Sequence, residues 1–195
     1  MQPTAPQQSP VPFADPTPLG LIGLAVGCAS LTPLAFGVQL SPSGLETTAM
    51  FCLLFGGGGQ LLAGLMAFAN RNVHGGTLLT AFSFNWFMNG WALLRLGSGV
   101  VPDHTVVMAT DVVFLLVFLG VTWAFLPFGP WLVALLVDVD VLYACRVVAA
   151  ATGIKALGPV IAVCTVALAL IALRIAYAGL VSGPPAAPAS ERSGG

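Results

Sequence analysis

The sequence predicts an all-α integral membrane protein with six transmembrane helices. Of the 195 residues, 57% are hydrophobic and only 7% are charged, and the mean hydropathy is +0.97. A soluble domain carries roughly a quarter charged residues, because its surface must face water. Six Lys/Arg and seven Asp/Glu are too few for that. The apolar residues are also grouped into stretches of about 20, the length that crosses about 30 Å of hydrocarbon.

Each predicted span lies between turn-forming segments. The six spans are residues 19–39, 45–69, 75–96, 106–126, 131–152 and 157–181. Pro, Gly, Ser and Asn mark the breaks between them. An even number of spans places both termini on one side of the membrane. Lys and Arg are spread over both faces, so the positive-inside rule does not fix the orientation; we expect cytoplasmic termini and a location in the plasma (inner) membrane.

The composition outside the spans predicts flexible ends. Residues 1–18 are rich in Pro and Gln, and residues 182–195 are mostly Pro, Ala, Ser and Gly, so we expect a flexible N-terminal tail, a six-helix domain at 19–181 and a disordered C-terminal tail. No basic run is present, which excludes a nucleic-acid footprint. Four cysteines within apolar stretches, without a CxxC pair, predict neither a disulfide framework nor a metal site. No cofactor is expected.

Polar side chains within the spans are the informative positions, because hydrocarbon offers them no hydrogen-bond partner. Gln60 lies in the middle of the second span. Phe82, Asn85 and Asn89 in the third span are three and four residues apart, so they share one helix face. Two interpretations stay open. The amides form hydrogen bonds between helices, worth about 1 kcal/mol each, or they line a pore above an aromatic constriction.

Charged residues within the fifth span are a second unusual feature. Asp138 and Asp140 lie near its middle, where a charge costs at least about 2.5–3.5 kcal/mol on insertion scales. Two residues apart on a helix, the carboxylates point about 200° from each other, so both cannot face one narrow pore. We expect one to line a water-filled path, where it could carry a proton, and the other to pair with a neighbouring helix or subunit; structural ion pairing of both is the alternative. The candidate partners are Arg146, Arg95 and Arg174.

Asp111 lies early in the fourth span, near the membrane face at which Arg95 lies late in the third span. Opposite charges at one depth favour a structural ion pair between these two residues. His74 and His104 lie in predicted loops, and we interpret each as a solvated loop residue rather than a ligand.

Three short motifs lie in the first half of the chain. Residues 15–21 read DPTPLGL, residues 55–64 read FGGGGQLLAG and residues 72–77 read NVHGGT. They resemble the N-P-A-P-L-G-L, Y-G-G-x-A-Q-x-x-A-G and N-T-F-G-x-T motifs of the acetate uptake transporter family, the succinate–acetate permeases. The clear resemblance covers residues 15–90, and the later spans fit by length without a firm motif.

The resemblance implies a six-helix protomer, a homo-hexamer and a narrow pathway through each subunit for acetate or related short carboxylates, often with proton coupling. It also implies a pore entrance at the N-terminal motif and an apolar constriction near mid-membrane. We assign the entrance to Asp15, Pro16, Pro18, Leu19 and Gly20. We assign the pore lining and constriction to Leu24, Gln60, Phe82, Asn85, Asn89 and Val139. The candidate proton or ion-pair sites are Asp138, Asp140, Arg146, Asp111 and Arg95.

The chain departs from the family pattern at positions that bear on its substrate. Asp15 stands where the signature has Asn, Asn85 replaces an aromatic residue, and Asp138 and Asp140 replace uncharged positions. Extra carboxylates repel acetate unless they are neutralised. A channel for a small neutral solute, such as urea or a short amide, is therefore the alternative within transport.

Two further classes of function differ in how well they fit the sequence. A non-transporting membrane assembly or sensor subunit would have the same composition. An intramembrane enzyme is not expected, because the spans contain no GxGD, HExxH or serine-nucleophile motif. The expected partners are a lipid bilayer and a small carboxylate or neutral solute.

Overall fold

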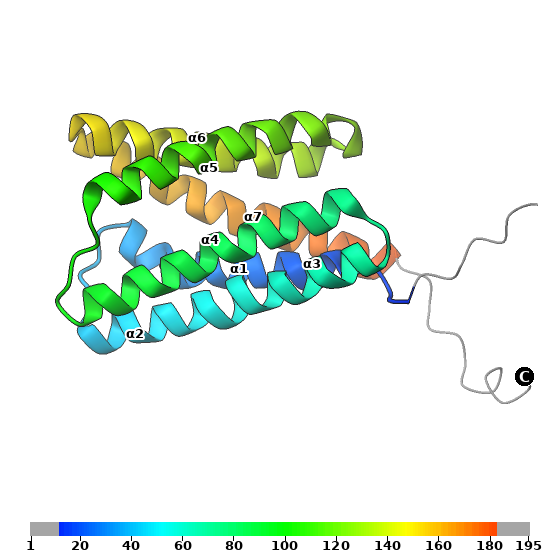
Figure 1. The fold of residues 1–195 in the computed structure, drawn as a ribbon, viewed down its shortest axis with the longest axis horizontal. Helices are drawn as coiled ribbons and strands as arrows, with labels where there is room; N and C mark the ends of the chain where they lie inside the picture. The colour runs from blue at the N-terminus through cyan, green and yellow to red at the C-terminus, as the bar shows by residue number, and fades with distance from the viewer. Residues whose placement is uncertain (1–11, 183–195) are drawn as a thin grey trace, which may run out of the picture.

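The computed structural model describes residues 12–182, and every regular element in that range is a helix (Figure 1). Of the predicted tails at 1–18 and 182–195, residues 1–11 and 183–195 lie outside the described residues. The described part of the first tail already contains the start of α1 at Thr17, and Ser182 is the last residue of α7. Six helical rods follow one another: α1 (Thr17–Ala35); α2, η1 and α3 joined end to end (Pro42–Phe51, Cys52–Gly59 and Gln60–Ala69); α4 (Val73–Gly97); α5 (His104–Phe125); α6 (Pro130–Thr152); and α7 (Gly158–Ser182). Short 3-10 turns, η2 (Leu126–Phe128) and η3 (Lys155–Leu157), precede α6 and α7. The all-α prediction is confirmed for this range.

The first rod ends four residues before the predicted end at residue 39. Gly37 has a φ of +81°, and the N–H of Val38 donates to the carbonyl of Pro33 at 3.0 Å. A left-handed glycine followed by such a backward bond ends a helix. The apolar residues after Gly37 extended the hydropathy pattern beyond the point at which the backbone turns.

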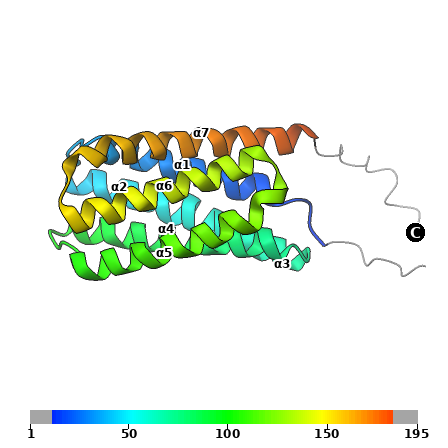
Figure 2. The same cartoon turned by 90° about the horizontal axis from the view of Figure 1, so that it is seen from above.

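The six rods lie side by side along the long axis of the molecule (Figures 1 and 2), and the start of α1 and the end of α7 lie at the same end. Four rods are long and apolar enough to cross a membrane by length and composition: Thr17–Ala35, Pro42–Ala69, His104–Phe128 and Lys155–Ser182. The other two, α4 and α6, have 25 and 23 residues. They are less apolar because they carry the amides and charges noted above.

The packing places α1 at the centre of one layer. It packs against α7, η1 and α3, while α4 packs against α2, η1 and α3. On the other side, α5 packs against α6, and α6 against α7. Much of α5 is exposed, with Asp111, Phe118 and Phe125 as its buried residues. The interior therefore lies between α1, α4, α6 and α7, with α5 covering α6 from outside.

Glycines allow the second rod to approach its neighbours closely. Residues Cys52–Gly59 form a π-helical stretch that contains four consecutive glycines. A Cβ at Gly56 would overlap the indole of Trp86, and one at Gly57 would lie 2.6 Å from the ring of Phe87. Small residues at such crossings let membrane helices pack backbone against backbone. The glycines of η1 therefore set how closely this rod approaches α4.

At the crossing of α1 and η1 the close contact is made by backbone rather than by a side chain, and this leads to a test. A Cβ at Gly23 would overlap the backbone carbonyl oxygen of Phe55, which cannot move aside as a side chain can. We expect Gly23→Ala to lower the free energy of unfolding by about 1–3 kcal/mol, as overpacking does elsewhere. Gly120→Ala is the matched control, since a Cβ at that position would meet no atom within 4 Å; it should be neutral or stabilise by about 0.5–1 kcal/mol. Thermal unfolding in detergent checks both, and equal melting temperatures would contradict the packing argument.

Candidate functional site

A cavity of about 290 Å³ lies between α1, α4, α6 and α7. On α1 its wall runs from Leu24 to Ala35, and most of the remaining wall is also apolar. The polar groups that line it are Asn85, Trp86 and Asn89 from α4, Tyr143 and Arg146 from α6, and Thr165 from α7. This volume holds a solute of a few heavy atoms together with water.

The polar face of α4 lines this cavity and also joins α4 to α6. The Asn89 amide donates to the side-chain oxygen of Asn85 at 2.6 Å and to its backbone oxygen at 3.0 Å. The Asn85 amide in turn donates to the hydroxyl of Tyr143. The sequence left open whether these amides bond between helices or line a pore. Asn85 does both, since it bonds to α6 and lines the cavity, and Asn89 lines the cavity beside it.

The guanidinium of Arg146 is held in place by Asp111. Arg146 Nε donates to Asp111 Oδ2 at 3.1 Å, and Nη2 donates to Oδ1 at 3.0 Å. Two parallel bonds of this kind fix a guanidinium in one orientation. The predicted pair of Asp111 with Arg95 is wrong, because Asp111 lies on α5, which packs on α6, whereas Arg95 is exposed near the end of α4. Depth in the membrane can be estimated from sequence, but lateral adjacency cannot.

Asp138 and Asp140 lie on either side of Val139, and it is Val139 that lines the cavity. Asp140 accepts a hydrogen bond from Thr122 of α5 at 2.7 Å, and Asp138 lies beside Cys164 of α7. One oxygen of each carboxyl, Asp138 Oδ2 and Asp140 Oδ1, is buried without a partner in the part of the chain that the structure describes. Each carboxyl lies about 100° around the helix from Val139, and neither aspartate is among the residues that line the cavity.

Neither aspartate forms an ion pair with Arg146, Arg95 or Arg174 among the described residues, so the predicted pairs within the chain are wrong; a pair with a neighbouring subunit stays a prediction. Arg146 binds Asp111, and the Arg174 guanidinium lies over the ring of Trp131 at 4.7 Å from its centroid. The expectation that one aspartate lines the path is also wrong for this cavity, since neither is among its lining residues.

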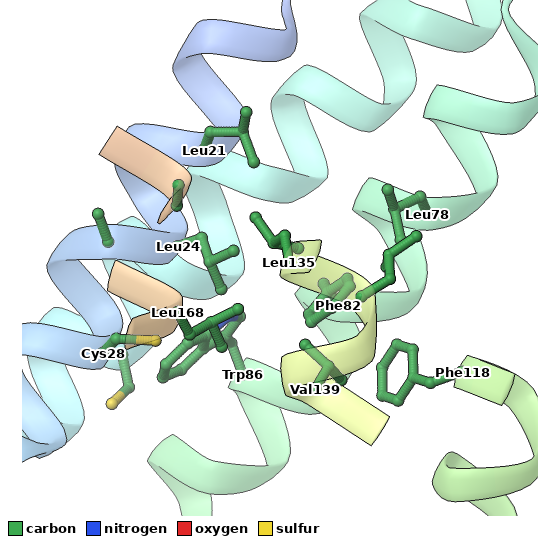
Figure 3. Close-up of a cluster of buried hydrophobic side chains, with 14 of the residues drawn as sticks. Leu21, Leu24, Cys28, Leu78, Phe82, Trp86, Phe118, Leu135, Val139 and Leu168 are labelled. Carbon is green, nitrogen blue, oxygen red and sulfur yellow. The ribbon is translucent and has the colours of Figure 1, made fainter. Parts of the chain in front are cut away.

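An apolar layer lies at the end of the cavity that is lined by Leu24, Phe82 and Val139. It consists of Leu21, Leu24, Leu78, Phe82, Leu135 and Val139, which converge from α1, α4 and α6 (Figure 3). Phe82 packs on Phe118 of α5 with ring centroids 4.6 Å apart. Leu24 and Val139 are each 1% exposed. All six side chains of the layer are apolar, so water and hydrated ions find no partner there.

A second cavity, of about 160 Å³, lies beyond the apolar layer. Leu21 and Leu78 of the layer line it on one side. The rest of its wall includes Thr17, Asn72, His74, Phe125 and Phe128. His74, which the sequence places in a solvated loop, is exposed, but it lies in the first turn of α4, 5.1 Å from the ring centroid of Phe128. The first cavity shares Leu24, Phe82 and Val139 with the apolar layer, and the second cavity shares Leu21 and Leu78. The two cavities therefore lie on opposite sides of the layer.

Three of the five predicted entrance residues are buried in the protein at the start of α1. Pro16, Pro18 and Gly20 are buried, while Asp15 and Leu19 are exposed. Asp15 accepts hydrogen bonds from the backbone N–H and the hydroxyl of Thr17, at 3.0 and 2.6 Å. None of the five lines the second cavity, whereas Thr17, the motif residue between the prolines, does.

Gln60 does not line either of these cavities. Its side chain is 1% exposed, and both its amide atoms lack a hydrogen-bond partner among the described residues. Its backbone N–H lies near Gly23, at the tight crossing of α1 and η1.

Sequence reasoning did not assign several residues of this site. Tyr143 and Trp86 line the cavity, and Asn70 binds the backbone of Phe13 through two hydrogen bonds of 2.9 and 3.0 Å. For Tyr143 a signal was available, because Val139, Tyr143 and Arg146 recur at helical spacing and so share a face. No local pattern distinguishes Asn70, whose partner is 57 residues away.

Comparison with known proteins supports the architecture. The bacterial acetate channel SatP has the same fold, with a TM-score of 0.78 over 90% of this chain and 98% of that chain, at 20% sequence identity. A stretch of 85 residues is 31% identical to ammonia transport outward protein 3 of Saccharomyces cerevisiae; it makes up 44% of this chain and only 30% of the length of that relative. No protein-family model matches the chain. The resemblance to the acetate uptake transporter family, first carried by the three motifs, is confirmed by this structural likeness and this sequence match.

Proposed function

We propose that this chain is a multi-pass membrane protein through which short monocarboxylates of the acetate type cross a bilayer. The observation that carries the proposal is the order of features along the bundle: a cavity with polar groups, an apolar layer, and a second cavity. An apolar layer of this kind blocks hydrated ions by dewetting and lets a small, weakly hydrated solute pass when side chains move aside. The fold shared with an acetate channel and the name of the yeast relative support the same class of function.

The proposal includes six membrane crossings and a homo-hexamer in the inner membrane, with both tails cytoplasmic. The polar residues of α4 and α6 face inward, so these two helices can cross a bilayer when α1, α5 and α7 cover them. The exposed apolar face of α5, with Leu116 64% and Trp123 76% exposed, suits lipid or a neighbouring protomer. The proposal assigns no enzymatic step to the chain.

Phe82 tests the apolar layer. We expect Phe82→Ala to raise passive acetate flux in proteoliposomes several-fold, because removing the ring opens the contact between the two cavities. The ring is 5% exposed, so the variant also loses about 3–5 kcal/mol of stability and must be shown to stay folded. Phe84→Ala is the control, since Phe84 lies two residues away and is 59% exposed. Equal flux for both variants and the wild type would remove Phe82 from the barrier.

Asn89 tests whether the polar cavity is reached from water. In a background without the four native cysteines, we expect Asn89→Cys to react with a small sulfonated thiol reagent and to lose flux as it does so. Met88→Cys is the matched control, because Met88 is the adjacent residue and is 46% exposed on the outer face. Labelling rates are measured by mass spectrometry. Labelling of the Met88 variant alone would contradict the proposed pathway.

Asp138 and Asp140 test the origin of any proton coupling. Because neither aspartate lines the cavity, we expect Asp138→Asn and Asp140→Asn to leave the pH dependence of acetate uptake unchanged. Uptake of labelled acetate between pH 5 and pH 8 measures this. A changed pH profile in either variant would assign the coupled proton to that carboxyl.

A further inference from the structure

We propose that the cavity takes its solute in an uncharged form, as an undissociated short-chain acid or the primary amide of the same shape. This inference rests on the proposed function and specifies the chemical state of the solute. An acid that crosses in this form brings its own proton with it, so no protein side chain has to carry that proton.

The charges around the cavity do not balance an anion. Arg146 is the charged residue among the described residues that line it, and the bidentate bond to Asp111 cancels its charge. The nearest further ionisable carboxyls, Asp138 and Asp140, flank Val139 in the same wall. They contribute no charge if protonated and negative charge if ionised. In both cases the sum is zero or negative, so a carboxylate would leave water without a compensating charge.

The hydrogen-bonding groups of the cavity suit a neutral carbonyl compound. Tyr143 accepts from Asn85, so its own hydroxyl proton is free to donate. Trp86 is 5% exposed, and its indole N–H has no acceptor in the part of the chain that the structure describes. The guanidinium of Arg146 has N–H groups beyond the two that bind Asp111. These donors match a carbonyl oxygen.

The same cavity also provides an acceptor and an apolar wall. The Asn89 amide donates its N–H to Asn85, which leaves the Asn89 carbonyl oxygen free to accept an O–H or N–H from the solute. A methyl group would contact Leu24 and Cys28 on α1. A carboxylate has no proton to donate to Asn89, whereas an undissociated acid and a primary amide both have one.

Acetamide is the decisive probe because it has the shape of acetic acid and does not ionise in the working range. Full-length protein is reconstituted in vesicles, and fluxes of acetamide and labelled acetate are compared at pH 8, with protein-free vesicles subtracted. We expect the acetamide flux to exceed the acetate flux by about tenfold or more, given the cost of an uncompensated charge. In a second arm, lowering the pH to 5 should raise acetate uptake as the acid form becomes available, with acetamide flux unchanged.

Asp111 supplies the matched variants. Asp111→Asn leaves the Arg146 charge unbalanced, so it should shift the acetate-to-acetamide flux ratio toward acetate by about tenfold. The double variant Asp111→Leu/Arg146→Met removes both charges, which proteins often tolerate. It also loses the Arg146 donor, so both fluxes should fall, but their ratio should keep the wild-type preference for acetamide. Asp103→Asn is the control on the same helix, because Asp103 is the exposed N-cap of α5 and Asn caps a helix equally well.

Each outcome separates this inference from the proposed function. Acetate flux at pH 8 equal to or above acetamide flux in the wild type would overturn the inference and leave the transport proposal in place. A shift of the double variant toward acetate would also overturn it, even if Asp111→Asn fails to fold. Absence of both fluxes from folded wild-type protein would remove the proposed function itself.

Discussion

A polar side chain inside a bilayer has to find its hydrogen-bond partner within the protein, because hydrocarbon supplies none. In this bundle that requirement gathers the amides of α4 and the phenol and guanidinium of α6 into one space between four helices. Apolar side chains are left to face outward, which is why α5 is exposed over most of its length. The cavity is thus a consequence of satisfying polar groups in a medium that cannot solvate them.

The polar groups that line the cavity also join the helices around it. The amide of Asn85 bonds to Tyr143 between α4 and α6, and Arg146 bonds to Asp111 between α6 and α5. These hydrogen bonds hold the helices of the cavity wall together. By contrast, the apolar layer is held by side-chain packing alone, so its residues can move without breaking a buried hydrogen bond. The bundle therefore combines a polar cavity held by hydrogen bonds with an apolar layer held by packing.

Glycine makes this compact arrangement possible. The crossing of α1 with η1 leaves no room for a Cβ at Gly23, and the π-helical stretch brings Gly56 against Trp86. Since Trp86 is itself a lining residue, the close approach of the η1 backbone to its indole helps to set the position of one cavity wall. Packing in the first half of the chain and the shape of the site are consequently linked.

Hydropathy and periodicity were sufficient to predict the fold class, the approximate bounds of the rods and the helix faces that carry polar residues. Both are local properties, so Asn85 and Asn89 could be placed on one face and Asp138 and Asp140 on different ones. Which helix lies beside which is a lateral question that periodicity does not address. The three-dimensional packing was needed to find that Asp111 binds Arg146 rather than Arg95, and that neither aspartate beside Val139 lines the cavity. A helix can be rotated and placed beside any neighbour without changing its own pattern, and the packing of all six rods together selects one arrangement.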